Sequence, residues 1–221
     1  MRKKIKKMGV IFMTVVVLYL TIGFIIHKFI FPEPEPDYAS YFGEGKQFYS
    51  KLEGFKQQVL NLQNDHVMLE ITLDPHAAGP PQHVHETFDE KFTVVEGTLS
   101  IMLMGQKQRF TVGQTVTIPK GAAHKPFNET DTKVVLRTPA PGLPQAFVFG
   151  LSQLYGYWDA APANSKPPKI LLALSVLGDS FDSYPTENAP PKPMLKLLKL
   201  VLAPTARLLG YTKYNPQFAP R

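Results

Sequence analysis

The longest apolar stretch of the chain is near its N-terminus, where residues 8–26 carry no charged side chain. A helix rises about 1.5 Å per residue, so these residues can cross a hydrocarbon core of about 30 Å. The stretch has no polar side, which argues against a helix of a soluble domain. A cleavable signal peptide is the main alternative, but its apolar region is only about 7–15 residues long and ends in small residues. We therefore predict an uncleaved transmembrane anchor.

Short runs of alternating apolar and polar positions follow in the middle of the chain, separated by Gly and Pro. Residues 98–104 show the alternation clearly, with Leu99, Ile101 and Leu103 on one side of a strand. Many short strands of this kind are typical of an all-β barrel or sandwich. Residues 48–62 are predicted as a short helix. The other predicted strands are residues 67–73, 91–95, 107–112, 115–118, 133–138 and 146–149.

Changes of composition divide the chain into four parts. The alternating prolines of residues 32–36 favour an extended, stiff spacer after the anchor. Proline-rich segments also follow the last predicted strand. The predicted parts are a basic tip with the anchor at 1–31, a connector at 32–64, a barrel at 65–150 and an extension at 151–221.

The extension contains a predicted amphipathic helix at residues 194–210, for which Gly210 is a plausible C-terminal stop. Lys192, Lys196, Lys199 and Arg207 fall on one side of this helix, and apolar residues occupy the rest. Two roles remain open. A basic amphipathic helix can lie on an anionic membrane surface, or its leucine side can cover the barrel or the partner subunit of a homodimer.

The positive net charge of +6 is located at the two ends of the chain. Residues 1–7 carry five basic side chains and residues 191–221 carry six, and neither segment has an acidic one. The middle of the chain is therefore acidic, which argues against a nucleic-acid partner. The basic ends flank apolar runs, a pattern that indicates a membrane partner. Basic residues before the anchor predict a single-pass protein with a cytoplasmic N-terminus and an extracytoplasmic barrel.

Candidate metal ligands are concentrated in one stretch of the chain. Three imidazoles, His83, His85 and His124, and the carboxylate of Glu90 together form an inventory of metal ligands. His83 and His85 are two residues apart, so they leave the same side of a strand. His124 must return from far along the chain, which requires a closed or strongly curved sheet. Four such groups unpaired in a barrel interior would be costly, so we predict that they bind one metal ion.

Two segments around these residues resemble the paired motifs of the cupin superfamily. The first reads H-x-H-x4-E-x6-G from His83 to Gly97, and the second reads G-x5-P-x-G-x2-H-x3-N from Gly113 to Asn128. One position departs from the pattern, because Ala77 stands where the family usually has Gly. The resemblance implies a small antiparallel cupin β-barrel, of the double-stranded β-helix or jelly-roll type, with a metal inside. The tail, which contains the sequence L-L-G-Y, resembles the extension of a membrane-anchored bacterial branch of cupins.

Other residues of the motif region are assigned less direct roles. His66 and His76 are predicted to lie at the surface or at a strand edge. Glu86 and Asp89 are either solvated loop residues or partners that orient an imidazole. The aromatic residues of the extension either cover the barrel mouth or touch lipid: these are Tyr155, Tyr157 and Trp158. Turn and shape roles are predicted for Gly97, Gly113, Pro119, Gly121 and Asn128.

Two classes of function are compatible with this sequence, because the fold does not determine the reaction. The first is a metal-dependent oxygenase or isomerase of a small organic substrate. The second is a non-catalytic ligand- or metal-binding envelope protein, such as a sensor or accessory protein. Imidazole and carboxylate ligands suit Fe, Mn, Ni, Cu or Zn. The chain has no cysteine, which excludes a thiolate site and a cysteine nucleophile. A roomy apolar pocket beside the metal favours the enzyme, and a filled barrel favours the binder.

Overall fold

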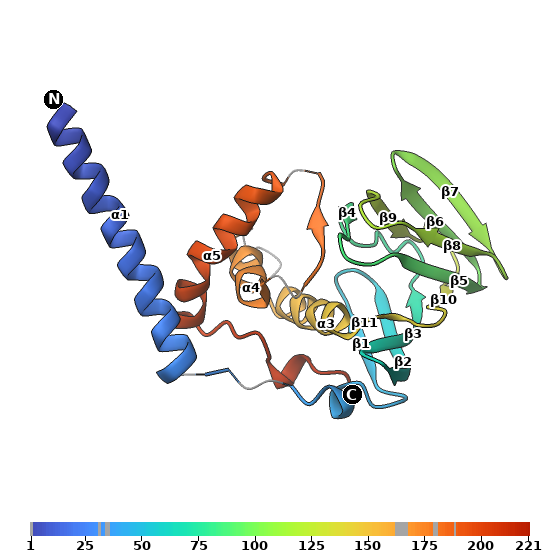
Figure 1. Ribbon diagram of the computed structural model, residues 1–221. Helices are drawn as coiled ribbons and strands as arrows, with labels where there is room; N and C mark the ends of the chain where they lie inside the picture. Colours follow the sequence, from blue (N-terminus) through green and yellow to red (C-terminus); the bar gives the residue numbers. More distant parts are fainter. Residues whose placement is uncertain (1, 31, 34–35, 162–167, 179–180, 188) are drawn as a thin grey trace.

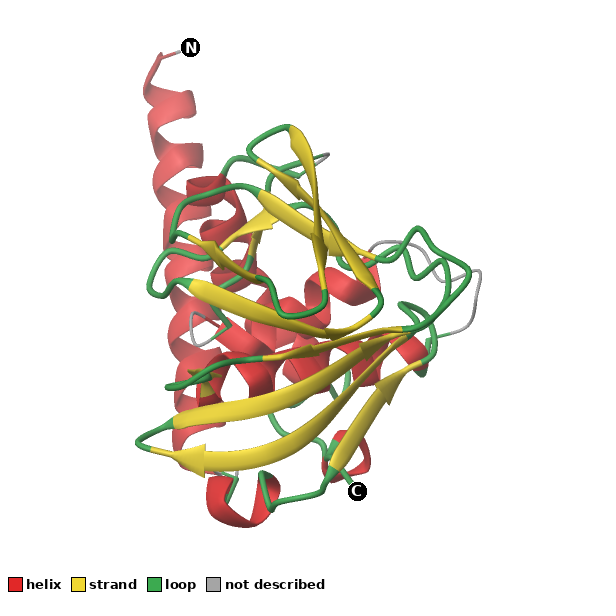
Figure 2. Ribbon diagram, turned by 90° about the vertical axis from the view of Figure 1, so that its right-hand side faces the viewer, coloured by secondary structure: helices red, strands yellow, loops and turns green. Residues whose placement is uncertain are grey.

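The computed structural model describes residues 2–30, 32–33, 36–161, 168–178, 181–187 and 189–221. One long helix stands at one side of the molecule, the strands gather at the other, and shorter helices lie between them (Figure 1). The view of Figure 2, turned by 90°, shows the strands in front of the helices. The helical part of the molecule therefore lies between the N-terminal helix and the sheets.

The larger sheet is antiparallel, with the order β1-β2-β3-β10-β5-β8, and β11 pairs with β3. Along β2, β3 and β5, buried and more exposed side chains alternate, as the two-residue period of a strand requires. Its strands are β1 (Gln47–Ser50), β2 (Phe55–Gln63), β3 (His66–Leu73), β5 (Glu90–Glu96), β8 (Thr115–Ile118), β10 (Val134–Arg137) and β11 (Leu143–Pro144).

The smaller sheet is also antiparallel, with the order β12-β4-β9-β6-β7. Buried residues of both sheets, such as Leu69 and Leu136 of the larger and Leu99 and Ile101 of the smaller, belong to one hydrophobic core. Its strands are β4 (His83–Val84), β6 (Thr98–Leu103), β7 (Gln106–Thr111), β9 (His124–Phe127) and β12 (Tyr184–Pro185).

The alternating pattern located most of these strands correctly. The strands predicted at 67–73, 91–95, 98–104, 107–112, 115–118 and 133–138 are confirmed as β3, β5, β6, β7, β8 and β10. The predicted turn role of Gly97 is also confirmed, because its φ is +78° and a Cβ there would lie 2.6 Å from the Lys133 carbonyl oxygen.

Two of the predicted elements are wrong. Residues 48–62 form β1 and β2 instead of a helix, and between the strands the chain turns at Gly54, whose φ is +63°. The buried amide of Gln57 hides the alternation of Phe55 and Val59 on the same side of β2. Residues 146–149 belong to helix α3 (Gln145–Asp159) instead of a strand. Four apolar residues cannot distinguish the two structures, and only the longer window shows the helical period.

The predicted all-β class is too narrow for this chain, because helices make up a large part of it. Beside α3, the structure contains α2 (Tyr38–Tyr41), α4 (Pro168–Leu177), α5 (Lys192–Leu208) and the 3-10 helix η3 (Pro216–Phe218). Buried residues of α3 and α4, such as Phe147 and Ala173, join the same core as the strands. The extension is thus packed on the sheets, because its apolar sides need that cover.

The N-terminal helix α1 (Arg2–Ile25) continues as a π-helical turn at Ile26–Ile30. Residues Lys3–Ile30 are long and apolar enough to cross a membrane by length and composition, and no residue of the most apolar window is buried. A signal sequence near an N-terminus passes the same test. Near its C-terminal end α1 meets α5, where the Tyr19 hydroxyl donates a hydrogen bond to the Val201 carbonyl (2.9 Å).

Helix α5 ends where the sequence predicts, since Leu209 caps it and Gly210 follows with a φ of +88°. Its lysines lie on the side toward β12, where Lys199 is buried and Lys196 stays exposed. The Nζ atoms of Lys192, Lys196 and Lys199 lie 4.6, 5.8 and 5.5 Å from the ring centre of Tyr184 in β12. The outward side of α5 is apolar, with Met194, Leu197, Leu200, Leu208 and Leu209 exposed.

The segment after the N-terminal helix and the last residue of the chain are both tied to the folded part. The Glu33 carboxylate, in the predicted spacer, accepts hydrogen bonds from Arg207 Nε (3.2 Å) and Lys213 N (3.0 Å). Residues 34–35 of that spacer and residues 162–167 of the extension lie outside the described residues. Arg221 exchanges two backbone hydrogen bonds with Gln47, which extends the larger sheet beyond β1. The extension therefore touches both sheets, through β12 and through its last residue.

Candidate metal centre and its cavity

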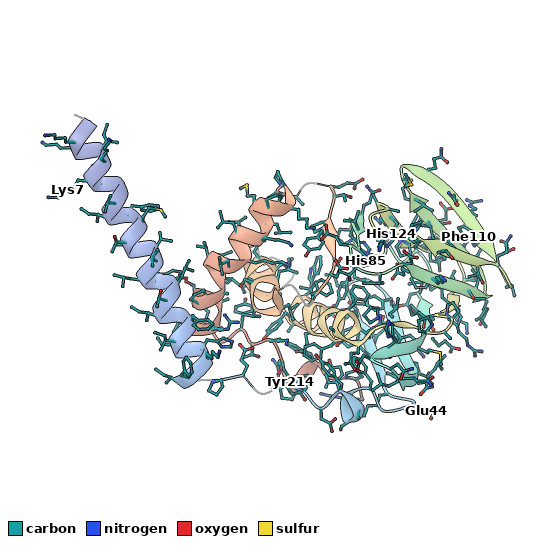
Figure 3. All side chains as sticks on the ribbon, in the orientation of Figure 1. Lys7, Glu44, His85, Phe110, His124 and Tyr214 are labelled. Atoms are coloured by element: carbon teal, nitrogen blue, oxygen red, sulfur yellow. The ribbon has the colours of Figure 1, made fainter. Side chains whose placement is uncertain are left out.

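The four predicted ligand residues come together in the interior, from strands of both sheets. His83 in β4 lies directly opposite His124 in β9, and Glu90 is the first residue of β5. His85 follows β4 by one residue. All four side chains are buried. The ligand atoms of the three histidines lie within 4.8 Å of one another, and Figure 3 shows His85 and His124 side by side.

Each histidine is oriented by a backbone carbonyl. The Nδ1 atoms of His83, His85 and His124 lie 2.8, 2.5 and 2.9 Å from the carbonyl oxygens of Pro81, Asp182 and Ala122. A carbonyl oxygen only accepts, so Nδ1 carries the proton in all three rings. In the neutral imidazole, this leaves the Nε2 lone pair free, and the hydrogen bonds hold the three rings in place. Such outer hydrogen bonds are the usual support of metal-binding histidines.

Two of the Nε2 atoms lack a hydrogen-bond donor among the described residues. His85 Nε2 is fully buried and has no hydrogen-bond partner within the described part of the chain. His124 Nε2 lies 3.0 Å from Glu90 Oε2, although a neutral ring with its proton on Nδ1 and a carboxylate are both acceptors. A shared proton or a cation must separate them. Ligand atoms about 3.0 Å apart fit adjacent positions around an ion with bonds of about 2.1 Å. The group could therefore hold a metal ion.

The pKa values describe the site before a cation enters. Burial lowers the pKa of His83 to about 3, and the neighbouring histidines add to this; burial also lowers the pKa of His85. Burial alone would raise the pKa of Glu90, but the histidines, His124 foremost, outweigh it and lower the pKa. Burial alone would lower the pKa of His124, but Glu90 outweighs it and raises the pKa. A cation therefore meets two neutral imidazoles and displaces one proton, held between His124 and Glu90.

Asp182 is a supporting residue that the sequence did not reveal. Its carbonyl oxygen accepts the Nδ1 hydrogen bond of His85, 97 positions away in sequence. Its carboxylate accepts hydrogen bonds from the backbone N–H groups of Glu86 and Thr87 and from the Thr87 hydroxyl, at 3.0 Å or less. The extension thus holds the loop between His85 and Glu90, and no local pattern around Asp182 signals this role.

The two acidic residues predicted between the ligands do not orient an imidazole. The exposed Glu86 carboxylate forms an ion pair with Lys192 of α5, and Asp89 accepts a hydrogen bond from the backbone N–H of Lys120 (2.9 Å). Both residues lie in the loop between β4 and β5, as predicted. Neither of these two acidic residues contacts a histidine of the site. The acidic residue that supports His85 is Asp182, which belongs to the extension.

The remaining residues of the motif region shape the chain around the centre. The buried Asn128 amide donates to the carbonyl oxygens of Asp74 (2.8 Å) and Thr132 (2.7 Å), and its own oxygen accepts from Thr130 N (2.9 Å). His66 and His76 lie outside the histidine group. At the position that departs from the family pattern, the Ala77 carbonyl accepts from Asn128 N (2.9 Å).

A cavity of about 200 Å³ opens beside the candidate metal centre, and His83 and Glu90 are part of its wall. Strands of the larger sheet form one side. Helix α3 forms another, with lining residues that recur at helical spacing: Phe147, Leu151, Leu154, Tyr155 and Trp158. Tyr155 and Trp158 stack with ring centres 5.7 Å apart. Of the two roles left open for these aromatic residues, covering the barrel is the one that fits Tyr155 and Trp158, whereas Tyr157 packs on Tyr211 and Phe218 in the extension.

The buried carboxyl group of Glu53, in the connection between β1 and β2, is expected to make the free energy of unfolding depend on pH. Burial raises the pKa of Glu53 to about 7; Lys125 opposes the shift and Asp159 adds to it. Between about pH 4.5 and pH 7, Glu53 holds its proton more firmly in the folded state than in the unfolded state. The stability that Glu53 contributes therefore falls as the pH rises through this range. We expect Glu53→Gln to raise the free energy of unfolding at pH 8 by about 1–3 kcal/mol and to change it little at pH 4.5.

Urea unfolding of the purified protein, followed by the fluorescence of Trp158, measures this difference at both pH values. The exposed Glu44→Gln substitution removes the same charge from the surface and serves as the control. An equal effect of Glu53→Gln at pH 4.5 and pH 8 would show that folding does not raise the pKa of Glu53.

Comparison with known proteins identifies the strand-rich part of the chain. The family model described as the cupin domain matches residues 69–138, which include all four predicted ligand residues. No curated protein matches the chain.

Three of the similar solved structures illustrate the relationship. KdgF from Halomonas sp. is 26% identical, over 42% of this chain and 84% of that protein, with a TM-score of 0.35. A cupin-2 domain containing protein from Shewanella frigidimarina is 30% identical, over 38% and 78%, with a TM-score of 0.32. An RmlC-like cupin from the same organism is 24% identical, over 45% and 88%, with a TM-score of 0.37. Through its domain at residues 69–138, the chain belongs to the cupin superfamily.

Proposed function

We propose that this protein is a membrane-anchored, metal-dependent cupin enzyme that acts as an oxygenase or isomerase on a small organic substrate. The observation that supports the proposal best is the convergence of three oriented imidazoles and the Glu90 carboxylate at the wall of a cavity. The ligand atoms alone would serve a structural ion equally well. Their position beside an open space gives a bound molecule access to the ion.

The proposed ligands are His83, His85, His124 and Glu90, which would bind one divalent ion of Fe, Mn, Ni, Cu or Zn. When bound, the ion would supply Lewis acidity and open coordination positions toward the cavity. The backbone carbonyls that hold the Nδ1 protons keep the three rings oriented. Glu90 supplies a negative charge that lowers the cost of burying a dication. It also shares with His124 the proton that leaves when the ion enters.

The alternative is a non-catalytic protein that binds a ligand or a metal in the cell envelope. A barrel completely filled by side chains would favour that function. The cavity beside His83 and Glu90 favours the enzyme instead, because a substrate needs space next to the reactive centre. The two functions differ in turnover, which a single preparation can test.

The experiment measures metal content and turnover of the same sample. Wild-type protein is purified without chelator, supplied with Fe, Mn, Ni, Cu or Zn in turn, and analysed for bound metal. We expect about one ion per chain for at least one metal. That form is then screened for dioxygen uptake and for isomerisation of small organic compounds. Less than roughly one ion per ten chains for every metal would reject the metal centre. A stoichiometric ion with no turnover would favour the alternative.

The membrane part of the proposal rests on α1 and its neighbour α5. The apolar part of α1 is exposed along its length, and Gly23 packs closely against Pro204 of α5. The exposed side of α5 that carries Leu197 and Leu200 is therefore next to the candidate span. We infer that α1 crosses the bilayer with its N-terminus in the cytoplasm, that the cupin domain lies outside, and that the leucine side of α5 contacts the outer leaflet.

Single cysteines can report this topology, because the chain has none of its own. A membrane-impermeant thiol reagent is applied to right-side-out and inverted membrane vesicles. We expect Met104→Cys, at the exposed β6–β7 turn, to react only in right-side-out vesicles, and Lys4→Cys only in inverted ones. Leu200→Cys is expected to react in neither until detergent is added. Reaction of Met104→Cys in inverted vesicles only would reverse the orientation, and free reaction of Leu200→Cys would reject the contact of α5 with lipid.

A further inference from the structure

We propose that the cavity selects an elongated, largely apolar molecule that carries an oxygen-containing group at its metal end. This inference rests on the function proposed above and names the substrate class for that site. Sugars, sugar acids and phosphorylated compounds are disfavoured by the same wall.

The composition of the cavity wall indicates that the ligand is largely apolar. Most of the lining comes from aliphatic and aromatic side chains, including Phe55, Ile71, Phe92, Leu136, Leu174 and Phe181. No lysine or arginine lines the cavity among the described residues. A phosphate or a sugar acid needs cationic or several polar partners when it leaves water. An apolar molecule gains about 0.8 kcal/mol for each methylene group that it buries. The wall therefore matches a hydrocarbon chain or ring and offers only a few polar side chains, such as Gln57 and Ser183, to a polyhydroxylated compound.

The order of the strands in the wall indicates that the ligand is elongated, because it gives the cavity a long axis. Ile71 in β3 is paired with Gln57 in β2 on one side and with Leu136 in β10 on the other. Leu136 is paired in turn with Val94 in β5, the strand that begins with Glu90. Three strand spacings of about 4.8 Å each thus separate the strand of Gln57 from the strand of Glu90. The apolar residues Ile71 and Leu136 lie on the strands between these two polar groups.

The far end of this axis has a polar group without a partner. The side chain of Gln57 is only 4% exposed, lines the cavity and makes no hydrogen bond within the described part of the chain. The Gln57 amide is accessible from the cavity and is not among the buried atoms without a partner, so a ligand that enters can supply its hydrogen-bond partner. A hydroxyl or carbonyl oxygen at the distal end of the molecule would satisfy it. The expected ligand is therefore polar at the metal end, apolar along its middle and tolerant of one hydroxyl at its far end.

The test uses straight-chain hydroxamic acids, from acetohydroxamic to octanohydroxamic acid, because the head group binds metal ions and the chain probes the wall. The full-length chain is reconstituted in phosphatidylcholine vesicles, with and without its metal. Trp158, the only tryptophan of the chain, lines the cavity and reports binding by fluorescence. Protein-free vesicles correct for partition of the probes into lipid.

We expect the dissociation constant to fall about fourfold for each added methylene group until the cavity is filled. This gain is expected with and without metal, because the wall supplies it. The additional affinity of the head group is expected only with metal, and it tests the proposed function separately. Equal dissociation constants for the acetyl and octanoyl compounds would overturn the apolar class. Binding of galacturonate or glucose 6-phosphate more tightly than octanohydroxamic acid would overturn it as well.

Matched variants on α4 locate the binding in the cavity. Leu174→Phe adds volume to the wall. We expect it to weaken the binding of octanohydroxamic acid at least tenfold and to leave the metal content unchanged. Leu172→Phe makes the same change on the same helix outside the lining and is expected to match the wild type. Equal binding by the two variants would reject this cavity as the site. For Gln57→Leu, we expect loss of any preference for 8-hydroxyoctanohydroxamic over octanohydroxamic acid; a retained preference would reject the contact with Gln57.

Discussion

Replacing His83 and His85 together with Ala is expected to abolish metal binding while the fold persists. The two side chains supply two of the three converging Nε2 atoms. A site reduced to His124 and Glu90 keeps two ligands, too few to hold a transition ion against water. Each single replacement is expected to lower occupancy and to weaken affinity by at least about tenfold, because the remaining ligands cannot complete the coordination.

Metal content after loading, measured together with the far-ultraviolet circular dichroism spectrum, checks this result. His66→Ala and His76→Ala are the matched controls, since both histidines lie outside the buried group, and their occupancy is expected to equal that of the wild type. The double variant also removes buried groups, so its stability must be measured separately. A folded double variant that still binds one ion per chain would show that the ion is held elsewhere.

Asp182→Ala is expected to weaken metal binding by about 10–100-fold, the range typical of residues that support metal ligands. Without the carboxylate, the backbone N–H groups of Glu86 and Thr87 lose their acceptor, and the segment that carries the Asp182 carbonyl is released from the His85 loop. The His85 ring then loses its fixed orientation. The loss of three buried or partly buried hydrogen bonds to a charged group is also expected to lower the free energy of unfolding by about 2–4 kcal/mol.

Competition with a chelating indicator dye measures the metal affinity of this variant. Glu187→Ala, an exposed acidic residue in the same segment, is the control and is expected to bind metal as the wild type does. Thr87→Val removes one of the hydrogen bonds to Asp182 and is expected to give a smaller loss. If Asp182→Ala bound metal with wild-type affinity, the orientation of His85 would not depend on this segment of the extension.

Much of the domain could be predicted from the sequence, because strands leave a local signal. The alternation of Leu99, Ile101 and Leu103 located β6, and glycines with positive φ, such as Gly97, marked the turns. The prediction failed where the local signal was short or was interrupted by a buried polar residue. Gln57 placed a polar residue on the buried side of β2, where it faces the cavity, and thereby hid the strand.

The part of the site that the sequence determined by itself is the local one. His83 and His85 leave the same side of a strand because side chains alternate with a period of two, and the motif spacing predicted Glu90 and His124 as their companions. Only the tertiary structure decided that Asp182 holds the loop between His85 and Glu90 and that α3 closes the cavity. The physical reason is distance along the chain. These contacts join segments up to about a hundred positions apart, and which segments meet depends on how all the apolar surfaces are buried together.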